Sequence, residues 1–263
     1  MALLSTTRAP RHPALAGVVE LLWLSPGRGA GRLDRVIPTG SPHLVWRVGS
    51  PIRFACGQIE RRGVLGGARS TSHVHVTATG WSVGAMLCPG AIPRLFGASA
   101  RELAERHTGL DDLWGPVAAR LQARLEESPC LDLVEQVLAE QLRPDRRPAG
   151  LVRAHRMLAD GASVERAARA VQRTPRALNH WFHDHIGLSP RRWATVRRVR
   201  RAMAIAADEP DGLTVALRAG YADHPHLCRD FRAVTGITMG QWRHHRPGEP
   251  SHVAVDRAHP HSE

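Results

Sequence analysis

The sequence contains no lysine, so all 36 of its basic side chains are arginines, and with 24 acidic side chains the formal net charge is +12. It has one tyrosine and four cysteines, and no two cysteines form a C-x-x-C pair. This spacing argues against a zinc ribbon or a disulfide framework and favours a reducing cytoplasm. No run of about 18 apolar residues is present, which excludes a membrane span. We therefore expect a cytoplasmic protein with no membrane partner.

The chain of 263 residues divides into parts of different character. Residues 1–100 contain short apolar runs separated by Gly and Pro, which is typical of strands. In residues 101–142, leucines and valines recur every three or four positions, which predicts helices. Residues 143–150, RPDRRPAG, are the expected linker, and residues 151–246 are helical throughout. Residues 247–263 lack apolar periodicity and are expected to be disordered.

The positive charge is concentrated in the helical part. Residues 1–149 carry 18 arginines against 13 acids, whereas residues 150–246 carry 17 against 8 over a shorter stretch. Because the absence of lysine points to a coding bias toward arginine, the position of the charge is better evidence than its total. If one region binds a polyanion, we expect it to be the helical part.

An internal duplication with a period of 49 residues runs through this part. Four pairs of residues recur at identical spacing: Leu178/Leu227, Phe182/Phe231, Gly187/Gly236 and Trp193/Trp242. Three further pairs are expected upstream at the same offset: Val164/Leu213, Ala167/Ala216 and Ala168/Leu217. Such self-similarity indicates two copies of one supersecondary unit.

Each copy has the pattern of a helix, a tight turn and a second helix, over residues 163–184 and 212–233. Thr174 and Asp223 are the expected N-caps of the second helices, and the repeated glycines would end those helices in a left-handed conformation. A long helix is expected between the copies, beginning after Ser189. Its roughly 18 residues would span about 27 Å. With the offset of each unit added, a helix of that length could set two recognition helices into neighbouring turns of the DNA major groove, which are about 34 Å apart.

Residues 151–246 resemble the DNA-binding domain of the AraC/XylS family of bacterial transcription regulators. The resemblance rests on PRALNHWFHDHIGLSPRRW (175–193) and GYADHPHLCRDFRAVTGITMGQWR (220–243). The second stretch fits the family pattern G-[FY]-x-D, R-x-F and G-[IV]-[ST] throughout. The first unit departs from the family at its turn, where Gln172-Arg173 replaces the favoured Gly-Leu.

The family alignment implies that six outward-facing residues contact bases: Arg176, Asn179, His180, His224, Pro225 and Arg229. The chemistry agrees, because Arg suits guanine O6 and N7 and Asn suits adenine N6 and N7. Four further residues are candidates for contacts to the DNA backbone: Arg173, Thr174, Arg192 and Arg232. The alternative interpretation is that these side chains belong to an ordinary solvated surface.

The N-terminal part resembles a domain found in one branch of the same family, through RVIPTG (35–40), HLVW (43–46), LCPGAIP (87–93) and LDDLWG (110–115). This resemblance implies an α+β chain: a β-rich, cupin-like barrel with trailing helices over residues 1–142, then the all-α domain of two helix-turn-helix units joined by a long helix. Effector sensing or dimerisation is the implied role of the first domain. Its candidate ligand-binding residues are Arg35, His43 and Trp46.

A metal site in the barrel is a competing interpretation. Gly67, His73 and His75 match the first half of the cupin metal motif, and residues two apart on a strand point to one side. No Glu follows at the required spacing, and the second half of the motif is missing. Two histidines do not complete a catalytic metal site. We therefore expect no metal, no cofactor and no catalytic residue.

The predicted function is a sequence-specific regulator that places two recognition helices in adjacent major-groove turns of double-stranded DNA, modulated through its N-terminal domain. The alternatives are a cupin-type metal-dependent enzyme fused to a DNA-binding module, and a nonspecific nucleic-acid binder. The family also implies a small-molecule effector, a homodimer and, if the protein activates transcription, RNA polymerase as a partner.

Overall fold

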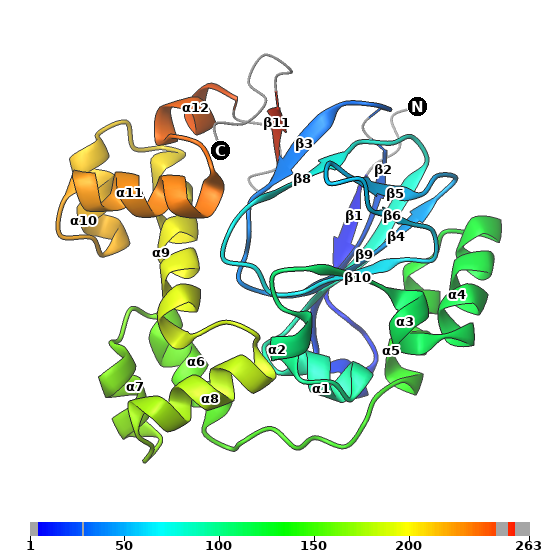
Figure 1. The fold of residues 1–263 in the computed structure, drawn as a ribbon, viewed down its shortest axis with the longest axis horizontal. Coiled ribbons are helices and arrows are strands. Elements are labelled where there is room, and N and C mark those ends of the chain that lie inside the picture. Colours follow the sequence, from blue (N-terminus) through cyan, green and yellow to red (C-terminus); the bar gives the residue numbers. More distant parts are fainter. Residues whose placement is uncertain (1–4, 28, 246–251, 256–263) are drawn as a thin grey trace.

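The computed structural model describes residues 5–27, 29–245 and 252–255. A β-rich N-terminal domain lies beside a helical C-terminal domain (Figure 1), which confirms the α+β prediction. Residues 143–150 connect the two domains without forming a helix or a strand.

The strands form two antiparallel sheets, which together make up the barrel. In order across the first sheet they are β1 (Thr6–Arg8), β2 (Val19–Pro26), β9 (Trp81–Leu87), β4 (His43–Val48), β7 (Val64–Gly66) and β10 (His107–Gly109). In the second sheet they are β11 (His252–Val255), β3 (Leu33–Val36), β8 (His73–Val76), β5 (Ile52–Phe54) and β6 (Ile59–Glu60). The long pairing of β2 with β9, from Val19 opposite Leu87 to Pro26 opposite Trp81, anchors the first sheet.

Strand β4 shows how the sequence separates the two faces of the first sheet. Its side chains alternate between half-buried and buried, as expected for period-two geometry. Trp46 and its neighbours two positions away point into the core beneath the helices. His43 and Arg47 point to the opposite side and line the barrel cavity.

Five helices follow β9 and cover the outer face of the first sheet. They are α1 (Ala91–Phe96), α2 (Ala100–Leu103), α3 (Leu110–Trp114), α4 (Pro116–Glu127) and α5 (Leu131–Glu140). Near the N-terminus, Pro13–Leu15 add one 3-10 turn. The apolar stripe of α4, including Leu121 and Leu125, joins the core of this domain. These helices therefore use their apolar faces to pack on their own barrel.

The helical domain consists of α6 (Leu151–Ala159), α7 (Val164–Ala170), α8 (Pro175–His185), α9 (Pro190–Ala206), α10 (Gly212–Ala219), α11 (His224–Thr235) and α12 (Met239–His244). The expected caps are present: Thr174 Oγ1 accepts the N–H of Ala177 at 3.2 Å, and an Asp223 carboxylate oxygen accepts the N–H of His226 at 2.7 Å. The repeated glycines have positive φ, 95° after α8 and 73° after α11.

The upstream half of the repeat differs from the prediction by one residue. In α7 the buried residues are Ala167 and Ala168, and their counterparts in α10 are Val215 and Ala216, an offset of 48 rather than 49. The N-caps Ser163 and Asp211 have the same offset of 48. The turn of the second unit is thus one residue longer than that of the first. The predicted pairing at an offset of 49 is therefore wrong in this half of the repeat, and Leu213 and Leu217 are 51% and 56% exposed.

The C-terminal segment also departs from the predicted disordered tail. Within residues 247–263 the structure describes His252–Val255, which form β11 and pair antiparallel with β3. Successive side chains of this strand face opposite sides, and both sides make contacts. Val253 is buried in the core of the second helix-turn-helix unit, while His252 lines the barrel cavity. The rest of that predicted tail lies outside the described residues.

The barrel contacts both halves of the helical domain. Ala68 belongs to the core around Phe182, and Ile37 belongs to the core around Phe231. Helix α8 also packs against α2. The two helix-turn-helix units lie at opposite ends of α9 (Figure 1), and each one contacts the N-terminal domain.

Candidate nucleic-acid interface and barrel cavity

The first half of helix α8 presents polar side chains to solvent. Leu178 and Phe182 are fully buried and fix the rotation of the helix. Arg176, Asn179 and His180, the predicted base contacts, are consequently exposed. The second half of the helix faces the N-terminal domain instead.

Helix α11 has the same arrangement. Leu227 and Phe231 are fully buried, which leaves His224, Pro225 and Arg229 exposed near the start of the helix. The ring of His224 is held in place, because its Nε2 lies 3.4 Å from Cys228 Sγ. It also packs so closely on Gly212 that a Cβ at that glycine would lie 2.6 Å from it.

One aspartate on each recognition helix organises the neighbouring basic groups. On α8, Asp184 is 3.2 Å from Arg101 of the N-terminal domain and 3.6 Å from His180. On α11, Asp230 is 3.1 Å from Arg198 of helix α9. Arg101 therefore ties the barrel domain to the first recognition helix, and Arg198 ties the linker helix to the second.

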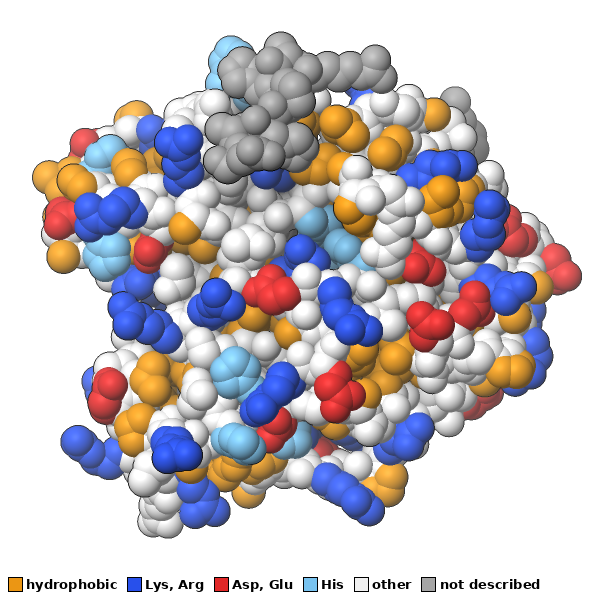
Figure 2. Space-filling model, viewed as in Figure 1, with side chains coloured by type: hydrophobic (Ala, Val, Ile, Leu, Met, Phe, Trp, Pro, Cys, Tyr) orange, Lys and Arg blue, Asp and Glu red, His pale blue; other side chains and the backbone are white. Residues whose placement is uncertain are grey.

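The four predicted backbone-contact residues are all exposed: Arg173, Thr174, Arg192 and Arg232. The guanidinium of Arg173 lies 5.3 Å from the ring centre of Trp181, a cation–π contact that orients it at the start of α8. Thr174 accepts a hydrogen bond from the helix through its oxygen, so its hydroxyl proton remains available to donate. Figure 2 shows arginine side chains spread over the left-hand edge of the molecule, where the helical domain lies.

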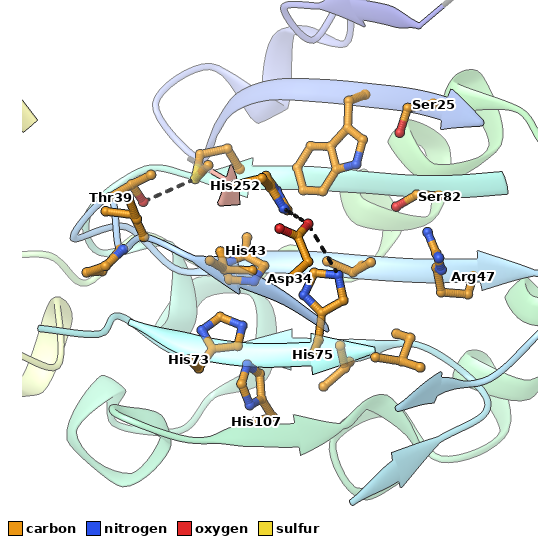
Figure 3. Close-up of a pocket in the computed structure, with 18 of the residues that line it drawn as sticks. Ser25, Asp34, Thr39, His43, Arg47, His73, His75, Ser82, His107 and His252 are labelled. Atoms are coloured by element: carbon orange, nitrogen blue, oxygen red, sulfur yellow. Dashed lines mark hydrogen bonds and ion pairs between the residues drawn. The ribbon is translucent and has the colours of Figure 1, made fainter. Parts of the chain in front are cut away.

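A cavity of about 410 Å³ lies inside the barrel. Apolar side chains from both sheets, among them Trp23, Phe54 and Met86, make up much of its wall. The polar groups converge from several strands (Figure 3): Asp34, His43, Arg47, His73, His75, His107 and His252. An apolar cavity with a few convergent polar groups is the usual form of a small-molecule site.

Three of the histidines are neutral at pH 7. Burial lowers the pKa of His43 to about 4 and that of His107 to about 3, and repulsion from neighbouring basic groups acts in the same direction. Burial also lowers the pKa of His73, with further contributions from His107 and His43. His107 stacks on Phe54 with ring centres 4.0 Å apart and meets His73 edge-on at 4.4 Å. These imidazoles therefore offer hydrogen bonds without adding charge.

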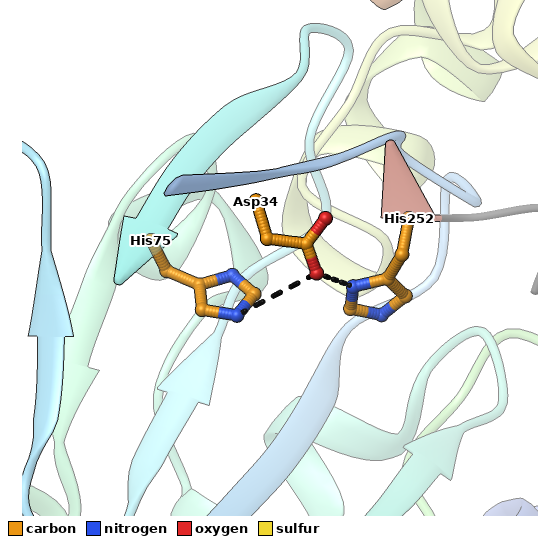
Figure 4. Close-up of side chains that lie close together, drawn as sticks. All are labelled: Asp34, His75 and His252. Atoms are coloured by element: carbon orange, nitrogen blue, oxygen red, sulfur yellow. Dashed lines mark hydrogen bonds and ion pairs between the residues drawn. The ribbon is translucent and has the colours of Figure 1, made fainter. Parts of the chain in front are cut away.

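A second group of side chains meets at one side of the cavity. His252 Nδ1 lies 2.8 Å from Asp34 Oδ2, and His75 Nε2 lies 4.0 Å from the same oxygen. Figure 4 shows the two rings approaching this carboxylate from opposite sides. One donor atom from each residue lies within 4.8 Å of the other two, so the three side chains form a cluster with the composition of a metal site.

The predicted ligand residues separate in the structure. His43 lines the cavity, whereas Trp46 is fully buried on the other face of β4 and stacks on Trp114. The guanidinium of Arg35 donates to Ser72 Oγ of the barrel at 3.0 Å and lies against Gly236 at the end of α11. Asp34 and His252 were not predicted as site residues. No local pattern brings them together, because they are 218 positions apart in the sequence.

The cupin-type pair His73 and His75 lines the cavity from β8, as expected for residues two apart on a strand. Their rings diverge, however: His73 packs against His107, and His75 approaches Asp34. These two imidazoles therefore take part in different clusters.

Both parts of the chain are similar to known protein families. Residues 167–245 match a family model described as "Helix-turn-helix domain", and residues 7–109 match one described as "Domain of unknown function (DUF6597)". An "Uncharacterized HTH-type transcriptional regulator" of Haemophilus influenzae is 26% identical over 113 residues, which is 43% of this chain. The chain spans only 38% of the length of that curated relative.

Two solved structures illustrate the distant structural similarities. The C-terminal domain of AraT, a response regulator from Geobacillus stearothermophilus, is 19% identical, covers 44% of this chain and 96% of its own length, and has a TM-score of 0.37. ToxT from Vibrio cholerae is 8% identical, covers 87% of this chain and 99% of its own length, and has a TM-score of 0.47.

Among the described residues, no helix is both long enough and apolar enough to cross a membrane.

Proposed function

Because its C-terminal domain belongs to the AraC/XylS family of helix-turn-helix transcription regulators, we propose that the chain binds a two-part operator in double-stranded DNA and that a ligand in its barrel controls this binding. The observation that carries the proposal is the exposure of the first half of both recognition helices, α8 and α11, at opposite ends of α9.

The length of α9 supports a two-part operator. Its 17 residues span about 26 Å, and each unit extends beyond the end of the helix. Successive major-groove turns are about 34 Å apart. This helix therefore has the length needed to set α8 and α11 into neighbouring turns on one side of the duplex.

The proposed division of contacts follows side-chain chemistry. Arg176 and Arg229 would read guanine, Asn179 would read adenine, and His180 and His224 would donate to base acceptors. Four residues would hold the phosphates on either side: Arg173, Thr174, Arg192 and Arg232.

The ligand proposed for the barrel is a small, largely apolar molecule. The volume of about 410 Å³ lies within the usual range for small-molecule sites. Neutral His43, His73 and His107 would hydrogen-bond its polar atoms. We further propose that the protein acts in the cytoplasm, without catalytic activity, and through homodimers and RNA polymerase where it activates transcription.

Selection of bound sequences from a random duplex library tests the DNA proposal. We expect two conserved half-sites with centres about 10 bp apart, and a 5 bp insertion between them should abolish the gain from the second half-site. Arg176→Ala should relax sequence preference in one half-site, and Arg229→Ala should relax it in the other. Equal binding to all sequences would instead favour the nonspecific nucleic-acid binder.

A further inference from the structure

We propose that Asp34, His75 and His252 bind a divalent transition-metal ion, which fastens strand β11 to the barrel. Asp34 lies on β3, His75 on β8 and His252 on β11, and in the second sheet β3 lies between the other two strands. Their donor atoms converge on one point at the cavity wall (Figure 4).

The distances fit such an ion. Bonds of about 2.0 to 2.2 Å place neighbouring donor atoms of a tetrahedral site about 3.3 to 3.6 Å apart. The 2.8 Å separation of Asp34 and His252 is slightly shorter than this value, and the 4.0 Å separation of Asp34 and His75 is slightly longer. The donor atoms of His75 and His252 lie within 4.8 Å of each other, so the two rings would move closer together when all three residues bind one ion.

The chemistry selects the class of metal. Two imidazoles and one carboxylate suit Zn²⁺, Fe²⁺ or Ni²⁺, whereas Ca²⁺ and Mg²⁺ prefer a set of oxygen ligands. Asp34 is only 5% exposed, and a cation bound to it would compensate its buried negative charge. Three protein ligands leave at least one coordination position for water or for an anionic group of a molecule in the cavity.

This set of ligands differs from the His-x-His pair of the cupin motif. His73, the first member of that pair, packs on His107 rather than on Asp34. Its place in the cluster is taken by His252, which follows the helical domain in sequence. The proposed site therefore cannot form until β11 has added to the edge of the sheet beside β3.

The position of β11 gives the metal a structural consequence. His252 faces the cavity, and the next residue, Val253, is buried in the core of the second helix-turn-helix unit. An ion bound at His252 would stabilise this strand between the two domains. The site itself does not depend on DNA binding, although any effect of the ion on operator affinity rests on the function proposed above.

Metal titration of the full chain, stripped with a chelator, tests the site. Zn²⁺ binding is followed by calorimetry, and Co²⁺ binding by its visible absorption spectrum. We expect one ion per chain and a loss of affinity of more than tenfold in Asp34→Asn and in His252→Ala. His73→Ala should retain binding, and so should the double variant His259→Ala/His261→Ala, which removes two other histidines near the C-terminus.

A second measurement guards against variants that fold poorly. In the wild-type protein, Zn²⁺ should slow hydrogen exchange at the amides of β11, and it should not do so in His252→Ala. The proposal is overturned if the wild-type chain binds no ion stoichiometrically, or if Asp34→Asn and His252→Ala bind as tightly as wild type. The proposal would also be overturned if His73→Ala lost metal binding, or if only the double variant His259→Ala/His261→Ala lost it.

Discussion

Ser72 of the barrel donates a hydrogen bond of 2.8 Å to the carbonyl oxygen of Thr235, the last residue of the second recognition helix. The backbone N–H of the same serine donates to the carbonyl of Val234 at 2.9 Å. Arg35 completes the contact by donating to the serine hydroxyl at 3.0 Å. Through these bonds, the residue that precedes strand β8 is joined directly to helix α11.

Ser72→Ala should weaken this connection. The variant loses the bond to Thr235 and leaves Arg35 without one acceptor, so we expect the free energy of unfolding to fall by about 1 kcal/mol. Ser50→Ala is the matched control, because its hydroxyl donates to Thr79 within exposed loops of the barrel. Chemical denaturation measures both variants. If the free energy of unfolding fell by the same amount in both variants, the hydrogen bond between the domains would contribute no more than one within the barrel.

The turns of the two helix-turn-helix units predict opposite effects of substitution. Gln172 has a φ of 55° and occupies the place that Gly220, with a φ of 88°, holds in the second unit. A side chain in the left-handed region costs about 1 to 2 kcal/mol. Gln172→Gly should therefore raise the free energy of unfolding by about 1 kcal/mol, and Gly220→Ala should lower it similarly.

Thermal denaturation of both variants checks this expectation. Among the residues that the structure describes, an added Cβ at Gly220 would meet only a guanidinium nitrogen of Arg201, at 4.0 Å, so steric overlap does not obscure the backbone effect. The interpretation fails if Gln172→Gly destabilises the protein.

Arg229→Ala should cost about 1 to 3 kcal/mol of binding free energy on the selected operator and relax preference at one base pair. Its control is Arg218→Ala, which removes the same charge from the neighbouring helix α10. A gel-shift or anisotropy titration at fixed salt measures both variants on operator and on random DNA. A loss of the same size on random DNA would identify Arg229 as a phosphate contact.

Acid should destabilise the protein through its buried histidines. The pKa of His43 is 6.5 in the unfolded chain and about 4 in the folded chain, where burial lowers it most and repulsion from His252, Arg69 and His75 lowers it further. As the pH falls below 6.5, the unfolded chain takes up a proton that the folded chain rejects, so stability declines until about pH 4. We expect a loss of about 2 kcal/mol between pH 7 and pH 5 from this residue.

Urea denaturation at both pH values measures the loss. His43→Gln, which cannot take up the proton, should show a shallower decline than the wild-type chain. Parallel profiles for the two proteins would mean that His43 does not contribute to the acid sensitivity.

The helical domain follows from the sequence because its signals are local. Caps such as Thr174 and Asp223, and the burial of Leu178 and Phe182, depend only on residues within a few turns. The length of the turn in the second unit could not be predicted from the sequence. One additional residue in this turn leaves the spacing of the apolar residues after Asp223 unchanged. Leu213 and Leu217, which an offset of 49 paired with Val164 and Ala168, are exposed in the structure.

The cavity was harder to predict, because it depends on which face of each strand the helices cover. The alternation along β4 is plain in sequence, but only the packing of α4 and α5 decides that Trp46 faces the core and His43 the cavity. Asp34 and His252 meet only through the pairing of β11 with β3. Such a long-range partnership leaves no mark on either local sequence.

Strand β11 has a consequence for biosynthesis. The second sheet of the barrel receives its last strand from residues that leave the ribosome only after both helix-turn-helix units have been made. A chain released early would carry complete helices α8 and α11 and a sheet with an open edge beside β3. The DNA-binding domain is thus synthesised completely before the last strand of the N-terminal domain, which is proposed to control DNA binding, has been made.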